Sequence, residues 1–508
     1  MREKSLQEYL ALLQNNGLAV RHELTEAAEN EPVRYISYSS LDVKPGTLFI
    51  CKGRGFRPQY LKEAIEKGVI CYIAEEEIIN DFPAIIVSDV RKAISDVSAF
   101  FFDSVWNRMK LIGVTGTKGK STTVTFVKAI LDSYCQSLGE AKPGFVSSVY
   151  IYDGENTYKQ IDRMTTPETL ELHQILAKCA GHGCRYAIVE TSSQALKYRR
   201  TEALAYEVGC LLNIGLDHIA DNEHPDMEDY IAAKLKIFDQ CRVACLNLDM
   251  DEEYLERARQ KAASCKKTIV FGTREERVLP GEDFYQPRDV RISGLTVDFK
   301  VTIDGQEEEI HVAMGGRHNL LNALAAVAIT ASLGVPAEHI KKGLAAAKVA
   351  GRMEIYALPD KRVDVIVDSA HNQMSYQAVV DAAHEIYPDR KVLFLISCVG
   401  GKSKNRRREV AEIANEGADR IIITEDWCFG EDPMQIFNEI KSYIRPDKDV
   451  EIIPDRAEAV RRAVAECGDD WVVLLTGFGV NDYQRLQCTK EGKMSDIILV
   501  EEYIRKHS

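Results

Sequence analysis

The segment 109–131 combines an apolar run, a glycine-rich turn and an amphipathic stretch, and it constrains the fold of this chain more than any other feature. The run from Met109 to Val114 predicts a short buried strand. Glycines then recur at every third position, 113, 116 and 119, before a segment with the apolar periodicity of a helix. A strand that passes through glycines into a helix N-terminus forms an anion site, because the backbone can approach phosphates closely and the first helical N–H groups point at them.

The Lys-Ser pair at the end of this turn indicates which anion binds. Lys120 would neutralise the β- and γ-phosphates of a nucleotide, and the Ser121 hydroxyl would bind Mg²⁺. The spacing is G-x-x-G-x-x-G-K-S, with its first glycine one position earlier than in G-x-x-x-x-G-K-[ST]. A plain glycine turn between two buried elements is the alternative, and it would leave the Lys-Ser pair unexplained. We therefore predict an ATP site formed by Gly116, Thr117, Lys118, Gly119, Lys120, Ser121 and Thr122.

Length and composition narrow the class of protein. A chain of 508 residues exceeds one hydrophobic core and suggests about three domains. The net charge of −14 disfavours nucleic acid as a partner, and no apolar run approaches the roughly 20 residues that span a bilayer. The 13 cysteines are scattered without a C-x-x-C pair, and the first residues lack the apolar core of a signal peptide. We predict a cytoplasmic enzyme without a membrane or nucleic-acid partner.

The pattern of strands and helices predicts an α/β protein of three domains. A central domain at 106–350 would hold the phosphate loop in a parallel sheet, because strands there alternate with helical stretches and end in polar residues. Within it, residues 291–313 predict an antiparallel hairpin. A smaller α/β domain at 1–105 would precede it, and a Rossmann-like α/β domain at 351–508 would follow. The predicted strands are 47–50, 70–73, 84–87, 186–189, 208–213, 244–247, 363–367, 392–396, 420–424 and 472–475.

Six further motifs follow the phosphate loop in a fixed order. They are Thr165-Thr166-Pro167-Glu168, Glu190-Thr191-Ser192-Ser193, Asn213 through Asp217-His218, Gly316-Arg317-His318-Asn319 with Asn322, Gly351-Arg352, and Asp368-Ser369-Ala370-His371. In this order and approximate spacing, the chain resembles the Mur ligase family along nearly its whole length. These are ATP-dependent, amide-forming ligases of peptidoglycan precursor synthesis, and the resemblance is strongest to the members that form the muramoyl tripeptide.

The resemblance adds metal-binding and catalytic roles to three residues outside the loop. Glu190 and His218 each follow a strand that should lie beside the phosphate-loop strand, where a carboxylate and an imidazole can hold Mg²⁺. A lone histidine is otherwise more often a hydrogen-bonded structural residue. Lys234 on a predicted helix would otherwise be a solvated lysine; the resemblance implies that CO₂ carbamoylates it and that the new carboxylate helps to position Mg²⁺. The expected catalytic residues are Lys120, Glu190, His218 and Lys234, and the expected metal site comprises Ser121, Glu190, His218 and carbamoylated Lys234.

The resemblance also implies the reaction and its small-molecule partners. A peptide carboxylate on a UDP-linked muramoyl substrate would attack the γ-phosphate of ATP, and an amino acid would displace phosphate from the acyl phosphate, with ATP and Mg²⁺ required. The residues expected to hold the peptide carboxylate are Thr165, Thr166, Ser192 and Arg200, and those expected at the nucleotide between the second and third domains are Asn319, Arg352 and Asp368. We expect a monomer.

The chain departs from the family in its first domain. The segment Lys44 to Ile50 keeps the pattern that follows the uridine-binding loop. The preceding Asp-Ser-Arg is here Ser39-Ser40-Leu41, so the contact that Ser40 should make with UDP is the uncertain part of an otherwise matching domain.

A sharper departure lies in the third domain, at the subsite for the incoming amino acid. The family's Asp-Asn-Pro-Arg is replaced within Thr424 to Pro433, and Gly-Lys-Gly-His-Glu is here Gly-Phe-Gly-Val-Asn at 477–481. The bidentate arginine and the acceptor glutamate have thus become Phe429 and Asn481, which removes a charge-assisted carboxylate clamp. Sequence drift in a loop is the alternative explanation. The residues expected around the amino acid are Asp426, Trp427, Phe429, Gly477 and Asn481.

Two other functions stay open from the sequence. A Mur-like ligase of another pathway could extend a different peptide or a glutamate-type carboxylate without UDP. A catalytically silent relative could bind nucleotide and serve as a scaffold, although that protein would have no reason to keep all of Lys120, Ser121, Glu190, His218 and Lys234.

Overall fold

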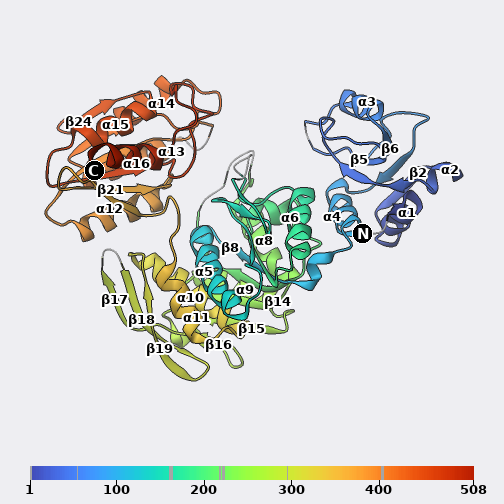
Figure 1. Cartoon of the computed structure of the whole chain (residues 1–508), viewed down its shortest axis with the longest axis horizontal. Helices are drawn as coiled ribbons and strands as arrows, with labels where there is room; N and C mark the ends of the chain where they lie inside the picture. The colour runs from blue at the N-terminus through green and yellow to red at the C-terminus, as the bar shows by residue number, and fades with distance from the viewer. Residues whose placement is uncertain are drawn as a thin grey trace. The chain divides into compact units, whose positions relative to one another are not determined.

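The computed structural model describes residues 3–53, 55–159, 164–216, 219, 223–293, 296–401 and 405–508 (Figure 1). It is an α/β structure, as predicted. The described chain divides into two compact units, with Met1–Ile219, Glu223–Tyr285 and Ala325–Ile340 in the first and Gln286–Leu324 with Lys341–Ser508 in the second. The predicted domain limits at residues 105 and 350 stay predictions.

The N-terminal part of the first unit is built on a five-stranded sheet of order β2-β7-β6-β5-β4. Four strands run parallel and β2 is antiparallel at the edge. The predicted strands at 47–50, 70–73 and 84–87 are confirmed, because all three are short apolar runs that the sheet buries. The elements are α1 (Leu6–Asn15), β2 (Ala19–Glu23), α2 (Glu26–Glu29), β4 (Tyr35–Ser37), β5 (Thr47–Ile50), α3 (Pro58–Glu66), β6 (Val69–Ala74), β7 (Ala84–Val87) and α4 (Val90–Phe101), with a small pair of β1 (Lys4–Ser5) and β3 (Pro32–Val33).

A nine-stranded sheet of order β11-β10-β9-β12-β8-β13-β14-β15-β16 forms the centre of the first unit. In the order of the sheet, the seven strands β9, β12, β8, β13, β14, β15 and β16 are parallel. At the edge next to β9, β10 and β11 pair in antiparallel fashion. The phosphate-loop strand β8 lies between β12 and β13, which confirms the predicted neighbours. The strands are β8 (Lys110–Thr115), β9 (Gly144–Val146), β10 (Ile151–Tyr152), β11 (Thr157–Tyr158), β12 (Tyr186–Glu190), β13 (Tyr206–Leu211), β14 (Cys241–Asn247), β15 (Lys267–Phe271) and β16 (Asp283–Tyr285).

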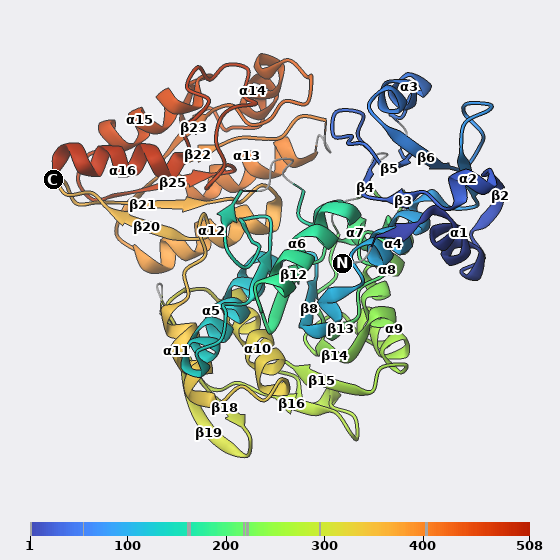
Figure 2. The ribbon, with the colours of Figure 1, turned by 45° about the vertical axis from the view of Figure 1, so that its right-hand side comes forward.

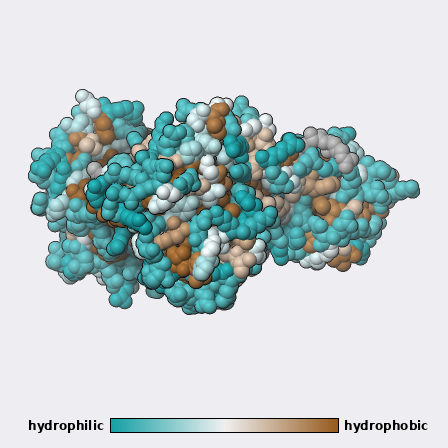
Figure 3. Space-filling view, turned by 90° about the horizontal axis from the view of Figure 1, so that it is seen from below, coloured by the Kyte–Doolittle hydropathy of each residue, from teal (hydrophilic) through white to brown (hydrophobic). Residues whose placement is uncertain are grey.

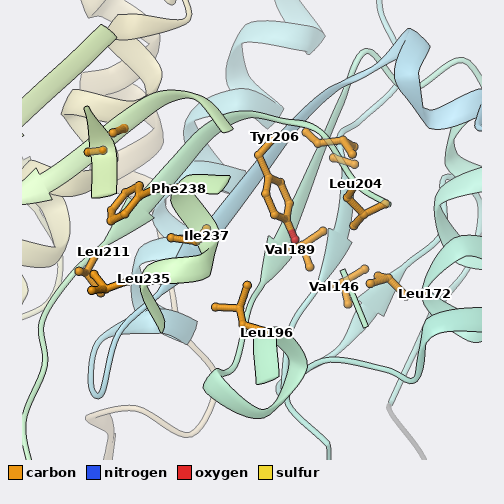
Figure 4. Close-up of a cluster of buried hydrophobic side chains, with 14 of the residues drawn as sticks. Val146, Leu172, Val189, Leu196, Leu204, Tyr206, Leu211, Leu235, Ile237 and Phe238 are labelled. Atoms are coloured by element: carbon orange, nitrogen blue, oxygen red, sulfur yellow. The ribbon is translucent and has the colours of Figure 1, made fainter. Parts of the chain in front are cut away.

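Helices carry the functional side chains at the carboxyl edge of this sheet. They are α5 (Lys120–Leu138), α6 (Thr169–Gly181), α7 (Ser193–Lys197), α8 (Met227–Leu235) and α9 (Glu252–Ala262), with short turns η1 (Val105–Arg108) and η2 (Lys236–Gln240). Helices α7 and α8 lie side by side (Figure 2). One core cluster fixes them on the sheet: it includes Leu172 of α6, Leu196 of α7 and Leu235 of α8, which Figure 4 labels together with Val189 and Tyr206 of the sheet.

The second unit contains two sheets. Strands β17 (Arg288–Ser293), β18 (Thr296–Ile303) and β19 (Gln306–Val312) form the predicted antiparallel addition. A six-stranded sheet of order β20-β21-β25-β22-β23-β24 follows, parallel except for β20. Its strands are β20 (Glu354–Ala357), β21 (Val363–Asp368), β22 (Lys391–Ile396), β23 (Arg420–Ile423), β24 (Asp449–Ile452) and β25 (Trp471–Thr476). The sequence did not predict β20 and β24, because both are edge strands that are only partly buried.

Helices of the second unit complete its α/β layers. They are α10 (Arg317–Ser332), which continues into the first unit, α11 (Ala337–Ala346), α12 (Gln373–Ile386), α13 (Asn405–Gly417), α14 (Pro433–Ser442), α15 (Arg456–Glu466) and α16 (Asp496–His507). None of the helices in the described chain is both long and apolar enough to cross a membrane. On the face drawn in Figure 3, hydrophobic residues form small groups separated by hydrophilic ones.

A buried histidine makes the stability of the first unit depend on pH. The His173 ring on α6 is fully buried and lies 4.5 Å from the Trp106 ring, centroid to centroid. Neither ring nitrogen has a hydrogen-bond partner among the described atoms. Burial lowers the pKa of His173 from 6.5 to about 3. The native state therefore keeps a neutral imidazole at pH values where the unfolded chain takes up a proton.

Acidification should therefore destabilise the parent protein more than a His173→Leu variant. Between pH 7.5 and 5.5, His173 alone should cost the parent about 1.4 kcal/mol, because only the unfolded state binds the proton in this range. Urea unfolding followed by Trp106 fluorescence, with Trp427→Phe and Trp471→Phe in both proteins, measures the difference. Parallel pH dependence in parent and variant would contradict the buried neutral imidazole.

Candidate active site

The loop after β8 has the geometry expected of a phosphate-binding loop. Gly119 ends it at φ = +83°, a left-handed conformation in which other residues are strained. A Cβ at Gly116 would lie 2.9 Å from the Leu212 Cβ, so the loop lies tightly against the segment after β13. Gly113, by contrast, lies inside β8, where a Cβ would come within 2.9 Å of the Tyr206 ring. The first glycine of the repeat thus makes room for a core aromatic ring and is not part of the loop.

Side chains of Lys120 and of Asn213, which follows β13, fix the loop's shape. The Lys120 Nζ donates to the carbonyl oxygens of Gly116 at 2.8 Å and Thr117 at 3.2 Å, so the ammonium lies over the loop. The Asn213 amide receives the Lys118 N–H at 2.8 Å and donates to the Lys118 carbonyl at 3.1 Å. The segment after β13 therefore holds the loop through the Asn213 side chain.

The Glu190 carboxylate lies next to the first turn of α5, where a metal ion was predicted. Its Oε1 accepts from the Ser121 hydroxyl at 2.9 Å. Its Oε2 accepts from the Ser147 hydroxyl at 2.6 Å and the Ser148 N–H at 3.0 Å. The carboxylate is only 2% exposed, and hydrogen bonds to a buried charged group each contribute about 1.5–3 kcal/mol. Sequence analysis missed the two serines after β9; adjacent hydroxyls at the end of a strand were the available signal.

The oxygen atoms around Glu190 fit a hard divalent cation. The Ser148 hydroxyl lies 3.1 Å from the Ser121 Oγ and 3.2 Å from the Glu190 Oε2, so three oxygen-bearing side chains converge. In the described part of the chain, no cluster of three His, Cys, Asp or Glu side chains could hold a metal ion. Mg²⁺ does not require such a cluster, because it commonly binds through one or two carboxylates, water and substrate phosphates.

Lys234 is buried, which excludes the solvated-lysine interpretation of the sequence. Its side chain on α8 is 1% exposed, and its Nζ lies 4.7 Å from the centre of the Tyr230 ring. The Tyr230 hydroxyl in turn lies 3.0 Å from the Thr117 Oγ1 of the phosphate loop. Lys234 therefore packs beside the α8 residue that contacts the loop. The predicted Asp217 and His218 lie outside the described residues.

Three of the residues predicted to bind the peptide carboxylate, together with the neighbouring Glu168, form one cluster beyond Glu190. The Thr166 hydroxyl donates to the Glu190 carbonyl at 2.8 Å and accepts from the Ser192 N–H at 3.0 Å. The Arg200 guanidinium donates to the Thr166 carbonyl at 3.2 Å and pairs with Glu168 at 2.7 Å. Thr165 precedes them and is partly exposed.

Glu168 also ties this cluster to the N-terminal sheet through Lys52, a residue that the sequence did not single out. The Lys52 Nζ lies 2.5 Å from the Glu168 carboxylate. Burial alone would raise the pKa of Glu168, but the charges of Arg200 and Lys52 hold it below its usual value. Glu168 is therefore ionised, and it forms an ion pair with the Arg200 guanidinium in this structure.

The predicted UDP contact at Ser40 is engaged within its own domain. Its hydroxyl donates to Glu63 at 3.3 Å, and its carbonyl accepts from the Lys67 Nζ at 2.6 Å. Leu41, at the position of the family's arginine, is 89% exposed. An apolar side chain thus projects where the resemblance implied a cation.

The three residues predicted to contact the nucleotide between the second and third domains all belong to the second of the two compact units. The Asn319 amide donates to the Gly315 carbonyl at 2.7 Å. Arg352 and Asp368 approach to 3.9 Å, and burial raises the pKa of Asp368 despite the neighbouring arginine. Their shared contact with a nucleotide stays a prediction.

The predicted amino-acid subsite contains an aromatic stack in place of the arginine clamp. The rings of Trp427 and Phe429 are stacked at 4.0 Å, and the Arg485 guanidinium lies 4.9 Å from the Trp427 ring centre. Phe429 is 50% exposed and has φ = +47°, so its ring is presented from a strained turn. Gly477 lies close by Asp426, because a Cβ there would be 3.2 Å from the Asp426 Oδ2. The Asn481 N–H donates to the Phe478 carbonyl at 2.9 Å.

The three acidic residues that could meet a substrate ammonium are not equivalent. Glu425 is fully buried and accepts from the backbone N–H groups of residues 487–489, so its carboxylate is committed to that loop. Asp426 accepts from the Trp427 N–H at 2.6 Å and the Ser397 hydroxyl at 3.2 Å. Glu431 accepts from the Gly401 N–H at 2.6 Å and pairs with Arg407. Glu425 is therefore excluded as a partner of a substrate ammonium group, whereas Asp426 and Glu431 remain candidates for that contact.

Comparisons with known proteins identify the family of this chain. Residues 114–330 match the Mur ligase middle domain, and residues 351–479 match the Mur ligase, glutamate ligase domain. The chain is 33% identical to a UDP-N-acetylmuramoyl-L-alanyl-D-glutamate–L-lysine ligase of Enterococcus faecalis, over 95% of this chain and 94% of the relative.

Solved structures share the fold. A UDP-N-acetylmuramoyl-L-alanyl-D-glutamate–2,6-diaminopimelate ligase aligns with a TM-score of 0.66 and 21% identity, over 99% of both chains. MurF ligase from Thermotoga maritima, solved in complex with ADP, aligns with a TM-score of 0.60 and 16% identity, over 94% of this chain and 99% of that chain. With the family match over both catalytic segments and a relative one-third identical along its length, the chain belongs to the Mur ligase family.

Proposed function

We propose that this Mur ligase joins an amino acid to the carboxylate of a UDP-N-acetylmuramoyl dipeptide and converts ATP to ADP and phosphate. Members of the family are ATP-dependent ligases that form amides and release ADP. The observation that carries the proposal is the joint placement of Ser121 and Glu190 beside the phosphate loop, with buried Lys234 next to Tyr230, the α8 residue that contacts that loop.

The reaction proceeds by activation of a carboxylate. The peptide carboxylate attacks the γ-phosphate and forms an acyl phosphate, and the amine then attacks the acyl carbon and phosphate leaves. The Lys120 ammonium group exchanges its hydrogen bonds with the loop carbonyls for contacts with the nucleotide phosphates. Arg200, Thr166 and Ser192 orient the peptide. Most of the rate comes from this positioning and from charge neutralisation.

Magnesium would be held at the edge of the phosphate loop. Ser121, Glu190, His218 and carbamoylated Lys234 are its proposed ligands or positioning groups, because Ser121 and Glu190 offer oxygen atoms at this edge and the family resemblance implies the other two. The cation would supply further neutralisation of phosphate charge. Glu190 needs no rearrangement for this role, since its Oε1 already lies 2.9 Å from the Ser121 hydroxyl.

We also propose that the amino acid carries a single carboxylate, with lysine preferred to diaminopimelate. The Trp427–Phe429 stack replaces the arginine that would pair with a second carboxylate, and an unpaired buried charge costs several kcal/mol, on the order of 3–5. An ammonium can be received by aromatic faces and by Asp426 or Glu431. The Enterococcus faecalis relative is named as an L-lysine ligase, which supports the same choice.

A different acceptor remains the second candidate, because Leu41 projects where the family has an arginine. A screen of phosphate release over UDP-muramoyl peptides and other glutamate-type peptides, each with lysine present, separates the two. Turnover only with acceptors that lack UDP would overturn the proposed acceptor.

Lys120→Ala should abolish ADP formation while the protein stays folded. The Lys120 ammonium donates to the carbonyl oxygens of Gly116 and Thr117 in the loop, and its loss removes the positive charge proposed to face the phosphates. Lys142→Ala, which removes a lysine exposed beyond the end of α5, is the matched control. A Lys120→Ala rate within about tenfold of the parent would contradict the ATP site.

Lys234→Ala should be nearly inactive, and added short-chain carboxylates or high bicarbonate should restore part of the turnover. The reason is that a free carboxylate can replace the missing carbamate in the cavity that the side chain leaves. Mass spectrometry under native conditions provides a second readout, because a carbamate adds the mass of CO₂. Normal turnover of Lys234→Ala would remove this residue from the mechanism.

Diaminopimelate should show a kcat/KM at least about tenfold below that of lysine with one fixed acceptor, because Phe429 stands where the family's arginine would pair with its second carboxylate. Ornithine, alanine and serine complete the series and report how much the side-chain ammonium contributes. The matched variant is Phe429→Arg, which should raise the kcat/KM for diaminopimelate relative to lysine. If diaminopimelate is the best substrate of the parent, the aromatic stack does not set specificity.

A further inference from the structure

A histidine that the mechanism does not use lies buried between α7 and α8. The His224 ring is fully buried, and its Nδ1 lies 2.6 Å from the Asp229 carboxylate on α8. Its Nε2 lies 3.0 Å from the hydroxyl of Ser193, the first residue of α7. The ring also meets the Tyr230 ring edge to face at 5.1 Å. One imidazole thus contacts the helix that follows Glu190 and the helix that carries Lys234.

The Asp229 carboxylate sets the orientation of this imidazole. Burial alone would raise the pKa of Asp229, but hydrogen bonds from Lys197 and His224 hold it below its usual value. The Lys197 Nζ lies 2.7 Å from the same carboxylate. An ionised Asp229 receives the Nδ1–H of His224, so the Nε2 is directed at Ser193. Such an arrangement fixes both the position and the tautomer of a buried ring.

These contacts complete a closed path around the candidate active site. From the phosphate loop, the Thr117 hydroxyl reaches Tyr230 on α8 at 3.0 Å, and Tyr230 packs on His224. His224 reaches Ser193, which lies three residues after Glu190 along the chain. Glu190 returns to the loop's helix through Ser121 at 2.9 Å. Each side chain on this path is at most 8% exposed, so water does not interrupt it.

We propose that His224 is a positioning residue of the ligase reaction: by joining α7 to α8 it closes this path and fixes the helix that carries Lys234. This role rests on the proposed function for its effect on turnover, but its effect on α8 is independent of any substrate. His224 does not touch the reacting groups. Its loss would let α8 and the phosphate loop move apart, and a displacement of about 1 Å in a catalytic constellation can lower a rate by about 100-fold.

Two conservative substitutions separate the two halves of this contact. In His224→Gln the side-chain amide reaches about as far as Nε2 and can keep the bond to Ser193. In His224→Asn the shorter side-chain amide reaches about as far as Nδ1, so it can keep the hydrogen bond to Asp229 but loses the one to Ser193. Ser193→Ala removes the same bond from α7 without altering the histidine. His173→Leu is the matched control, because it removes another fully buried histidine of the same unit that packs on Trp106 instead.

The kinetic test uses the full-length protein with ATP, the muramoyl dipeptide and lysine. His224→Asn and Ser193→Ala should each lower kcat about 10- to 100-fold, with the Kd for ADP within about twofold of the parent, while His224→Gln recovers part of the rate. The double variant His224→Asn/Ser193→Ala should be no slower than either single variant, because both remove one contact. His173→Leu should keep the parental kcat. Equal rates for His224→Asn and His224→Gln, or a parental kcat in His224→Asn, would overturn the proposal.

Hydrogen exchange of the α8 amides gives a readout that needs no turnover. Exchange across Met227–Leu235 should accelerate in His224→Asn and Ser193→Ala and stay parental in His224→Gln. Unchanged α8 exchange in His224→Asn and Ser193→Ala would overturn the role of His224. Absence of turnover in the parent with every acceptor and amine would instead overturn the proposed function, and the exchange result would still decide the role of His224.

Discussion

The buried carboxylate of Glu190 is the constraint on which the candidate active site depends. A charge removed from water must be surrounded by donors, and here those donors come from three places: the first turn of α5, the end of β9 and the backbone after β9. Satisfying one charge therefore brings Ser121, Ser147 and Ser148 into a fixed arrangement. Order at the edge where we propose that Mg²⁺ binds follows from the cost of leaving Glu190 unpaired.

The order of the parallel strands explains why these groups can meet. Strand β8 lies between β12 and β13, so the phosphate loop, Glu190 and Asn213 all leave the sheet at the same edge. Asn213 then holds the loop backbone, and Thr117 contacts Tyr230 on α8. Ligand sites of α/β sheets lie at this carboxyl edge, because loops there are free to converge while the strands stay rigid.

The second unit combines a Mur ligase fold with unexpected side chains at the predicted amino-acid subsite. The six-stranded sheet and its helices are those expected of the family, but the loop after β23 presents Trp427 and Phe429 where an arginine clamp was expected. Glu425 and Gly477 hold the surrounding loops in place, through backbone amides and a close approach to Asp426. The fold around the predicted subsite thus matches the family, whereas aromatic rings stand where an arginine was expected.

The sequence by itself determined the fold class, the phosphate loop, most interior strands and the family, because apolar runs and the Gly-Lys-Ser spacing are local signals. It did not reveal the edge strands β20 and β24, which bury too little to leave an apolar pattern. Nor did it distinguish Gly113, which accommodates the Tyr206 ring, from the glycines of the loop. Only the tertiary structure decided that Lys234 is buried, that Glu425 is unavailable to a substrate, and that Ser147, Ser148 and His224 contact residues of the site. Burial and hydrogen-bond partners depend on residues distant in sequence, and no local pattern encodes which of them will meet.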